Sequence, residues 1–170
     1  MSTLLIPLLK EILMKEIGES NIPPLLFTRT NKNQYKASIT LQDSTETITV
    51  EFQDFNEESI NDATREYYLP NFLLDLPKTY NVVYNIGGST TQLQKTDIKT
   101  LLTVLSTVTS IVKDFISSES PNALFITATE KQEEKVQKSN LYKAYILQQL
   151  KTITGYQAEP RREGELIFKK

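Results

Sequence analysis

The sequence predicts an α+β fold in which a single domain contains a mixed β-sheet flanked by helices. Three patterns lead to this prediction: two alternating segments typical of a β-hairpin, one long apolar stripe at helical spacing, and a short strand on either side of that stripe. The chain has 170 residues, of which 39% are hydrophobic and 24% charged, as is typical of one globular domain. We therefore treat residues 1–170 as a single domain.

The chain begins with a predicted helix over residues 2–17, which ends before Gly18. Pro7 falls within the first turns, where a helix tolerates it. The apolar side chains cover more of the helix than packing against one sheet requires. The helix is therefore either buried in its own domain or used as an interaction arm, and the residues assigned to that interface are Leu5, Leu8, Leu9, Ile12 and Leu13.

The next elements are an extended connector and a hairpin. Pro23 and Pro24 cannot continue a helix, so residues 21–33 are expected to be extended. Two alternating series then predict a hairpin with one buried face, made of Tyr35, Ala37, Ile39 and Leu41 followed by Ile48, Val50 and Phe52. Residues 53–79 have no clean period and are expected to form a long connection.

The C-terminal half predicts a β-α-β unit followed by a helix and a strand. Residues 80–86 are rich in β-branched and aromatic side chains, and a broad apolar stripe over 98–116 follows with Asp97 as its N-cap. Residues 123–128 are expected to form a central strand buried on both faces and parallel to 80–86. A helix over 134–154 capped by Gly155, and an edge strand over 165–169, complete the prediction. The strands over 80–86, 123–128 and 165–169 share one sheet with the hairpin.

The composition excludes several classes of function. The chain has no Cys and no His, which removes disulfides, thiolate nucleophiles, imidazole-based triads and zinc sites that depend on these residues. Its net charge of -2 lacks the positive field that nucleic-acid binding requires, so no direct nucleic-acid recognition is expected. The N-terminal apolar stretch is too short to cross a bilayer, and no membrane association is expected. We predict a protein made in a reducing cytoplasm.

Two groups of residues have features of binding sites but also have simpler explanations. Gly87 and Gly88 could form a phosphate-binding loop, but they lie about eight residues before the predicted cap, so a plain turn is favoured. Several carboxylates could bind a hard cation but lack the spacing of a calcium loop, and they are expected to be solvated: Glu51, Asp54, Glu57, Glu58, Asp62 and Glu66. No metal site and no cofactor are predicted.

Basic side chains near the C-terminus also have simpler explanations. Neighbouring glutamates neutralise much of the patch formed by Lys131, Lys135, Lys138 and Lys143. The tail cations could contact an acidic partner, although such charges are common at a terminus: Arg161, Arg162, Lys169 and Lys170.

Residues 80–156 resemble a family of uncharacterised tailed-bacteriophage proteins. The resemblance is carried by the strand before Gly87-Gly88, by Leu102–Val108, by the Pro121–Ala128 segment, by Leu141-Tyr142 and by Gly155-Tyr156. That family usually has Arg before the Leu-Tyr pair, where this chain has Asn140. The resemblance implies a phage protein, and in particular a virion protein, located in the virion and in the host cytoplasm before assembly.

The C-terminal half is also similar to the Gcn5-related N-acetyltransferase fold, in which a strand, a helix and a strand precede a helix that opens with Leu-Tyr. That similarity implies that Tyr142 would protonate the leaving thiolate of coenzyme A, because an unperturbed Tyr keeps its proton at neutral pH. The family's pyrophosphate loop is missing from this chain. The resemblance therefore implies an acetyltransferase-like fold whose cofactor site is lost.

Three functions follow as expectations. The first is a non-enzymatic virion structural or accessory protein of the head-tail or tail ring region, which assembles with copies of itself or with other virion proteins through its N-terminal helix. The second is an acyl-coenzyme A-dependent N-acetyltransferase that uses Tyr142. The third is an early phage protein that inhibits a host factor.

Overall fold

The computed structural model describes residues 22–41, 44–55, 76–87, 98–127, 144–160 and 165–170. The predicted helix over 2–17, most of the connection 53–79, and the first part of the predicted helix over 134–154 lie outside these residues. The fold is α+β and forms a single domain with a mixed sheet, as the sequence predicts.

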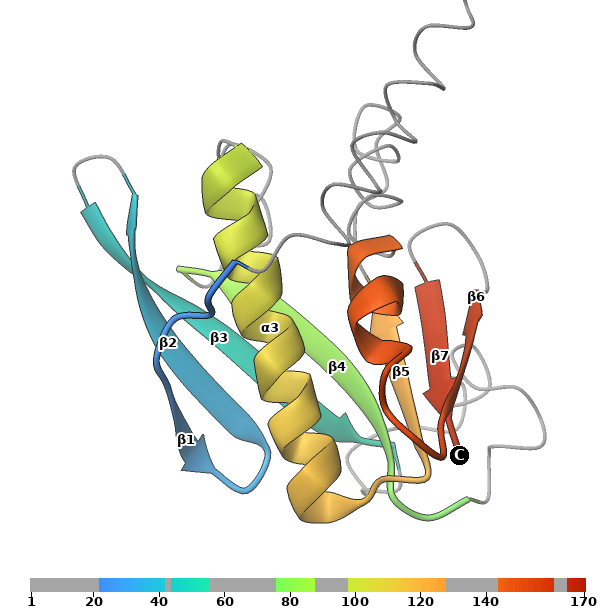
Figure 1. The fold of residues 1–170 in the computed structure, drawn as a ribbon. Coiled ribbons are helices and arrows are strands. Elements are labelled where there is room, and N and C mark those ends of the chain that lie inside the picture. The colour runs from blue at the N-terminus through green and yellow to red at the C-terminus, as the bar shows by residue number, and fades with distance from the viewer. Residues whose placement is uncertain (1–21, 42–43, 56–75, 88–97, 128–143, 161–164) are drawn as a thin grey trace, which may run out of the picture.

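Seven strands form one sheet within the described part of the chain (Figure 1). Their order across the sheet is β1-β2-β3-β4-β5-β7-β6. In chain order they are β1 (Phe27–Asn31), β2 (Gln34–Leu41), β3 (Ser44–Asp54), β4 (Thr79–Ile86), β5 (Ala123–Thr127), β6 (Gln157–Pro160) and β7 (Glu165–Lys169).

The predicted parallel pair lies at the centre of this sheet. β4 pairs with β5 in parallel from Thr79↔Ala123 to Val82↔Ile126, while all the other neighbouring strands are antiparallel. The helix α3 (Ile98–Glu119) makes the crossover between the two parallel strands. The β-α-β prediction is therefore confirmed.

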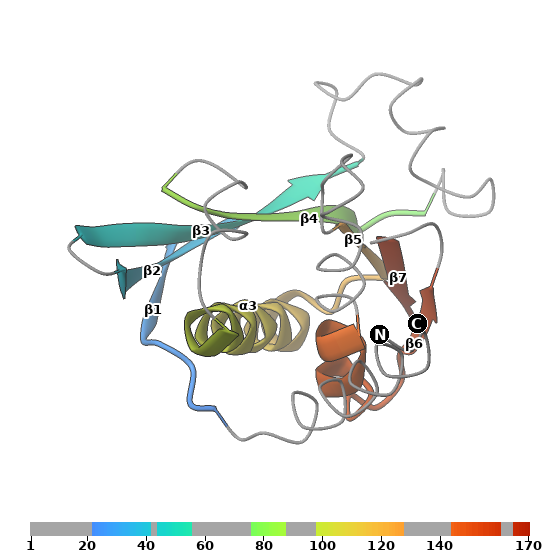
Figure 2. The ribbon, with the colours of Figure 1, turned by 90° about the horizontal axis from the view of Figure 1, so that it is seen from above.

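Two helical elements cover the same face of the sheet (Figure 2). One is α3. The other is the helix formed by residues 144–150, which lies beside β5 and β7 (Figure 1). From Leu105 to Phe115 the predicted apolar stripe of α3 is buried, and Val108, Ile111 and Phe115 each have no exposed surface. Tyr145, Ile146 and Leu150 are also buried. These side chains form the main core together with the inward positions of the predicted hairpin.

The second face of the sheet has a smaller apolar cluster. Phe125 and Ile167 are buried there with Ala123 and Phe55, and Leu76 packs against them. Leu124 and Ile126 point to the other face, into the main core. β5 is thus buried on both faces, as predicted for a central strand.

The structure corrects three boundaries. Residues 165–169 do not form an edge strand, because β7 pairs with β5 on one side and with β6 on the other. The expected connector 21–33 contains β1, which pairs with β2. The helix predicted to reach Thr154 ends at residue 150 and continues as turns to Gly155, whose φ is 89°.

The many threonines of α3 are compatible with the helix because their hydroxyls bond to the preceding turn. Thr109 is 2% exposed, and its Oγ1 donates to the Leu105 carbonyl at 2.6 Å. Thr107 has no exposed surface and donates in the same way to the Thr103 carbonyl at 2.8 Å. A buried hydroxyl with a partner avoids the cost of losing its hydrogen bond to water. α3 can therefore bury a side lined by hydroxyl groups as well as its apolar stripe.

Candidate functional site

The residues that the sequence assigns to function lie outside the described part of the chain. These are the interface residues of the N-terminal helix, Leu5, Leu8, Leu9, Ile12 and Leu13, and the alternative catalytic residue Tyr142. The structure does describe the segments that follow each of them. These segments are residues 22–26, which we call the N-terminal connector, and the helix that begins at residue 144, where Tyr145 comes three positions after Tyr142 in the sequence.

The N-terminal connector is bound to α3 through its main chain. The Ser106 hydroxyl donates a hydrogen bond to the Ile22 carbonyl oxygen at 2.6 Å. The Leu25 N–H donates to Thr107 Oγ1 at 2.9 Å. Both α3 residues are buried, with 7% and 0% of their surfaces exposed. Thr107 Oγ1 accepts from Leu25 while it donates to Thr103, so this one hydroxyl makes two bonds.

Tyr145 completes this contact from the last helix. Its side chain is 2% exposed, and burial raises the pKa of its phenol, while a hydrogen bond with Ser106 acts in the opposite direction. The phenol is therefore protonated at neutral pH. Ser106, Thr107 and Tyr145 together form what we call the connector site, which joins the connector, α3 and the last helix.

The side chains of the N-terminal connector divide between the core and the solvent. Leu25 is partly buried and packs against the main core. Pro23 and Pro24 are exposed, and Leu26 is 97% exposed. Figures 1 and 2 show the connector reaching from β1 to the side of α3 that faces away from the sheet. The segment that follows the predicted apolar helix therefore occupies a fixed place on the fold.

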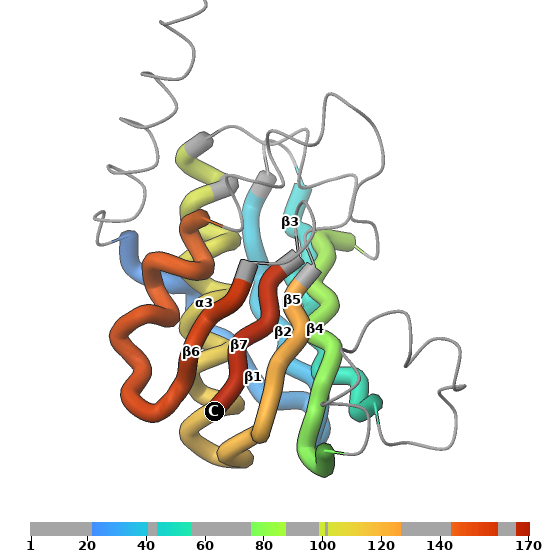
Figure 3. The backbone as a smooth tube through the Cα atoms, turned by 90° about the vertical axis from the view of Figure 1, so that its right-hand side faces the viewer, coloured from blue at the N-terminus to red at the C-terminus, as the bar shows by residue number. Residues whose placement is uncertain are grey.

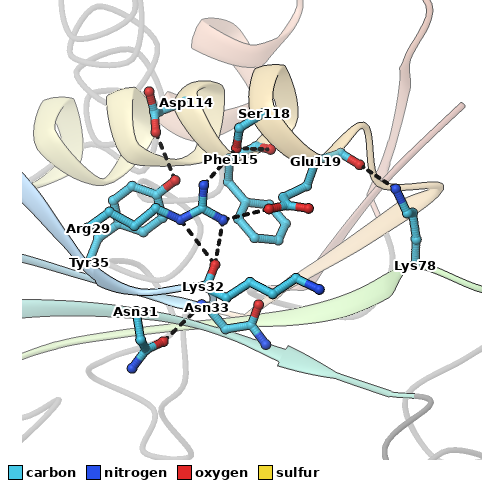
Figure 4. A network of polar contacts seen from close by, with 10 residues as sticks. All are labelled: Arg29, Asn31, Lys32, Asn33, Tyr35, Lys78, Asp114, Phe115, Ser118 and Glu119. Carbon is cyan, nitrogen blue, oxygen red and sulfur yellow. Dashed lines mark hydrogen bonds and ion pairs between the residues drawn. The ribbon is translucent and has the colours of Figure 1, made fainter.

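Next to the connector, the Arg29 side chain of β1 forms hydrogen bonds to the C-terminal end of α3 (Figure 4). Its Nε and one terminal nitrogen donate to the Lys32 carbonyl at 3.1 and 2.5 Å. The same terminal nitrogen lies 2.8 Å from Glu119 Oε1, and the other donates to Ser118 Oγ at 3.0 Å. The guanidinium therefore bonds to the β1–β2 turn and to α3 at once.

Two aromatic rings lie under the same guanidinium. Its central carbon is 5.3 Å from the ring centroid of Tyr35 and 5.7 Å from that of Phe115. The Tyr35 hydroxyl donates to Asp114 Oδ2 at 2.8 Å. Burial, followed by this hydrogen bond to a carboxylate, raises the pKa of Tyr35 to about 12. Because Arg29 and Tyr35 use their polar groups to hold neighbouring elements, we regard this group as structural.

The tail cations are also engaged within the fold. Lys169 forms an ion pair with Glu159 at 3.0 Å, and the Lys170 ammonium donates to the Ser120 carbonyl at 3.3 Å. Lys78 donates in the same way to the Glu119 carbonyl at 3.0 Å. Cations next to the carbonyls that end a helix interact favourably with its dipole. Arg161 and Arg162 lie outside the described residues.

A different feature lies where β4 and β5 separate. Their pairing ends at Val82↔Ile126, while β4 continues to pair with β3 as far as Ile86. Figure 3 shows the two strands adjacent along the lower part of their lengths, before β4 continues past the end of β5. Within the described strands, none pairs with the β5 side of residues 83–86. Beyond Val82, β3 is therefore the described strand that pairs with β4.

Gly87 ends β4 in a turn, as the sequence predicts. Its φ is 61°, and its N–H donates to the Thr47 carbonyl at 2.8 Å. A Cβ at this position would lie 2.8 Å from a carboxylate oxygen of Glu46. An acidic group so close to the glycine would repel phosphate. Gly88 and Asp97, the other residues considered for such a loop, lie outside the described residues.

The described ranges contain neither a cluster of metal ligands nor a membrane-spanning helix. No group of three or more acidic side chains converges there as metal ligands would. Glu51 and Asp54 are the described members of the predicted acidic run, and the rest of that run and the Lys131–Lys143 patch lie outside these ranges. None of the helices in the described ranges has both the length and the apolar character needed to cross a membrane.

Comparison with family models, curated proteins and solved structures finds no match for this chain.

Sequence reasoning missed both the connector site and the Arg29 contacts. Ser106 and Ile22 are separated by 84 positions, and Arg29 and Glu119 by 90. No local pattern links positions so far apart. The available signal was the row of serine and threonine residues in α3, because buried hydroxyl groups need partners.

Proposed function

We propose that the protein is a non-enzymatic structural or accessory component of a bacteriophage virion that works by assembling with copies of itself or with other virion proteins. The observation that carries the proposal is the attachment of Ile22 and Leu25 to α3. This contact holds the segment that follows the predicted apolar helix over 2–17 on the surface of α3. The phage assignment rests on the resemblance of residues 80–156 to tailed-phage proteins.

The geometry of the connector favours an arm that binds outside its own domain. Pro23 and Pro24 lie between the two attached residues and restrict the backbone of the connector, so the connector loses fewer conformations when it is ordered. One apolar helix that binds a groove on the next subunit makes a heterologous contact, which closes into a ring when the rotation permits. The head-tail and tail regions of phages contain such rings. The arm would bind through Leu5, Leu8, Leu9, Ile12 and Leu13.

The variant Leu9→Asp tests this assembly directly. A carboxylate in the apolar interface should convert oligomers to monomers in light-scattering measurements, while circular dichroism and the melting temperature stay unchanged. Lys10→Asp introduces the same group next to Leu9, outside the five interface positions, and should leave the oligomer intact. Unfolding of the Leu9→Asp monomer would assign the helix to the domain core, and persistence of its oligomers would show that the arm is not the interface.

The separation of β4 and β5 favours a second candidate, an acyl-coenzyme A-dependent N-acetyltransferase. The acetyltransferase-like interpretation requires the parallel β4–β5 pair with α3 as its crossover, and this pairing ends at Val82↔Ile126 while β4 continues beside β3. In that reaction a neutral amine attacks the thioester carbonyl and forms the amide bond as the carbon–sulfur bond breaks. Tyr142 would give its proton to the departing thiolate, and the proton that the amine nitrogen loses passes through water and restores Tyr142.

Calorimetric titration with acetyl-coenzyme A distinguishes the two candidates. The assembly proposal expects no binding at micromolar concentrations. Micromolar binding would favour the enzyme, and Tyr142→Phe should then reduce turnover without loss of binding.

A further inference from the structure

We propose that the connector site on α3 receives the N-terminal connector of a neighbouring copy of this chain when the protein assembles. In a single copy the same site holds the chain's own connector. This inference rests on the proposed assembly function and adds the place on the partner to which the arm is delivered. The occupant is therefore the Ile22–Leu25 segment of a second copy.

The contacts at the connector site can be made equally well by either copy. Two of them use main-chain atoms of the connector, the Ile22 carbonyl oxygen and the Leu25 N–H. Leu25 adds a partly buried apolar contact. An exchanged connector would form the same bonds to Ser106 and Thr107, so exchange between copies loses no contact at the site. The relative stability of the exchanged and unexchanged forms then depends on the hinge and on the apolar surface that the rest of the arm buries.

The hinge lies between the connector site and β1. Leu26 separates the attached Leu25 from Phe27, the first residue of β1, and it makes no buried contact at 97% exposure. β1 is secured independently, because Arg29 bonds to the β1–β2 turn and to Glu119. A change in backbone angles at Leu26 would therefore redirect residues 1–25 without disturbing the sheet.

Leu26 also provides a reason for the exchange to be favourable. It is the one large hydrophobic side chain that the described part of the chain leaves exposed. Transfer of such a side chain out of water favours association. An arm that crosses to a neighbouring copy carries Leu26 into the space between the two copies, where it can be covered.

The absence of cysteine from the chain makes this exchange easy to test. Leu25→Cys and Thr107→Cys place two thiols at positions joined by a 2.9 Å hydrogen bond from the Leu25 main-chain nitrogen to Thr107 Oγ1. That bond keeps the two Cα atoms within about 7 Å of each other, the range in which a disulfide forms. The two single variants are purified separately, mixed, incubated at assembly concentration and oxidised. A covalent dimer that contains one copy of each variant is the expected product, because only a connector bound to another copy can form it. Leu25→Cys mixed with Ser117→Cys, an exposed position about 15 Å further along α3, is the matched control and should give no such dimer.

A second pair, Ile22→Cys with Ser106→Cys, repeats the test at the other hydrogen bond and guards against a destabilised Thr107 variant. If both double variants close their disulfide within one chain while neither mixture of single variants gives a dimer, the connector is held only in its own copy and the inference is wrong. Oligomers detected by light scattering together with that result would leave the assembly proposal intact. A protein that stays monomeric would overturn both.

Leu26→Ser provides an independent measurement on the same hinge. It should raise the dissociation constant of the oligomer about tenfold, the lower end of what burial of a leucine contributes. Lys36→Ser, an exposed change on β2, is its control and should not change the constant. An unchanged constant for Leu26→Ser would contradict the proposed burial of this side chain.

Discussion

The Ser106 hydroxyl lies 2.6 Å from the carbonyl oxygen of Ile22, although 84 positions separate the two residues in the chain. This bond, with that between Leu25 and Thr107, fixes the place of the N-terminal connector on α3. The proposed function and the proposed exchange of connectors both begin from this relationship.

Ser106→Ala should lower the free energy of unfolding by about 1–3 kcal/mol, because it leaves the Ile22 carbonyl and the buried Tyr145 hydroxyl without this partner. Urea denaturation provides the measurement. Ser110→Ala is the control on the same helix and should change stability by less than about 0.5 kcal/mol. Equal effects of the two substitutions would show that the Ser106 bonds contribute little.

Arg29→Lys should destabilise the protein by about 2 kcal/mol, since an ammonium cannot reproduce the fork that bonds to Lys32, Ser118 and Glu119 or its contact with two rings. The reverse exchange at an exposed position, Lys36→Arg, should be neutral within about 0.5 kcal/mol. Chemical denaturation of both variants tests the prediction. A neutral Arg29→Lys would mean that charge alone is needed at this position.

Stability should fall as the pH rises from about 10 towards 12. Burial and the bond to Asp114 raise the pKa of Tyr35 to about 12, so above its ordinary value of 10 the unfolded chain loses a proton that the folded chain keeps. Burial raises the pKa of Tyr145 and Tyr156 too, which acts in the same direction. Tyr35→Phe should reduce the slope of unfolding free energy against pH in this range. An identical slope in the variant would show that Tyr35 does not hold its proton more tightly in the folded state.

Ser120→Gly should stabilise the protein by about 0.5–1 kcal/mol. Ser120 follows α3 with a φ of 47°, in the left-handed region where glycine has no steric penalty. Its N–H donates to the Ile116 carbonyl, and the substitution keeps that bond. Ser117→Gly, within α3, should instead destabilise by up to about 1 kcal/mol. Differential scanning calorimetry should show melting temperatures that move in opposite directions, and a common direction would refute the explanation.

The elements that the sequence predicted correctly are those with strong local periodicity. The stripe that contains Val108 and Phe115 identifies α3, and the alternation through Ile48 and Phe52 identifies β3, because burial of one face imposes the period of the element. The parallel order of β4 and β5 follows from the helix between them.

The parts that were missed depend on contacts between distant segments. β1 has only five residues, and its place at the edge of the sheet depends on pairing with β2 and on the contact between Arg29 and Glu119. β6 is short and contains Pro160, which weakens any strand signal, yet its pairing converts the predicted edge strand into an internal one. The connector site has the same cause, since Ser106 and Tyr145 meet only after the domain has folded.

Quantitative mass spectrometry of purified phage particles tests the central claim of assembly most directly. The proposed function predicts peptides of this chain in mature virions, at a constant molar ratio to the other structural proteins. Detection only in the lysate of infected cells, and not in particles, would contradict virion assembly and favour an early protein that inhibits a host factor.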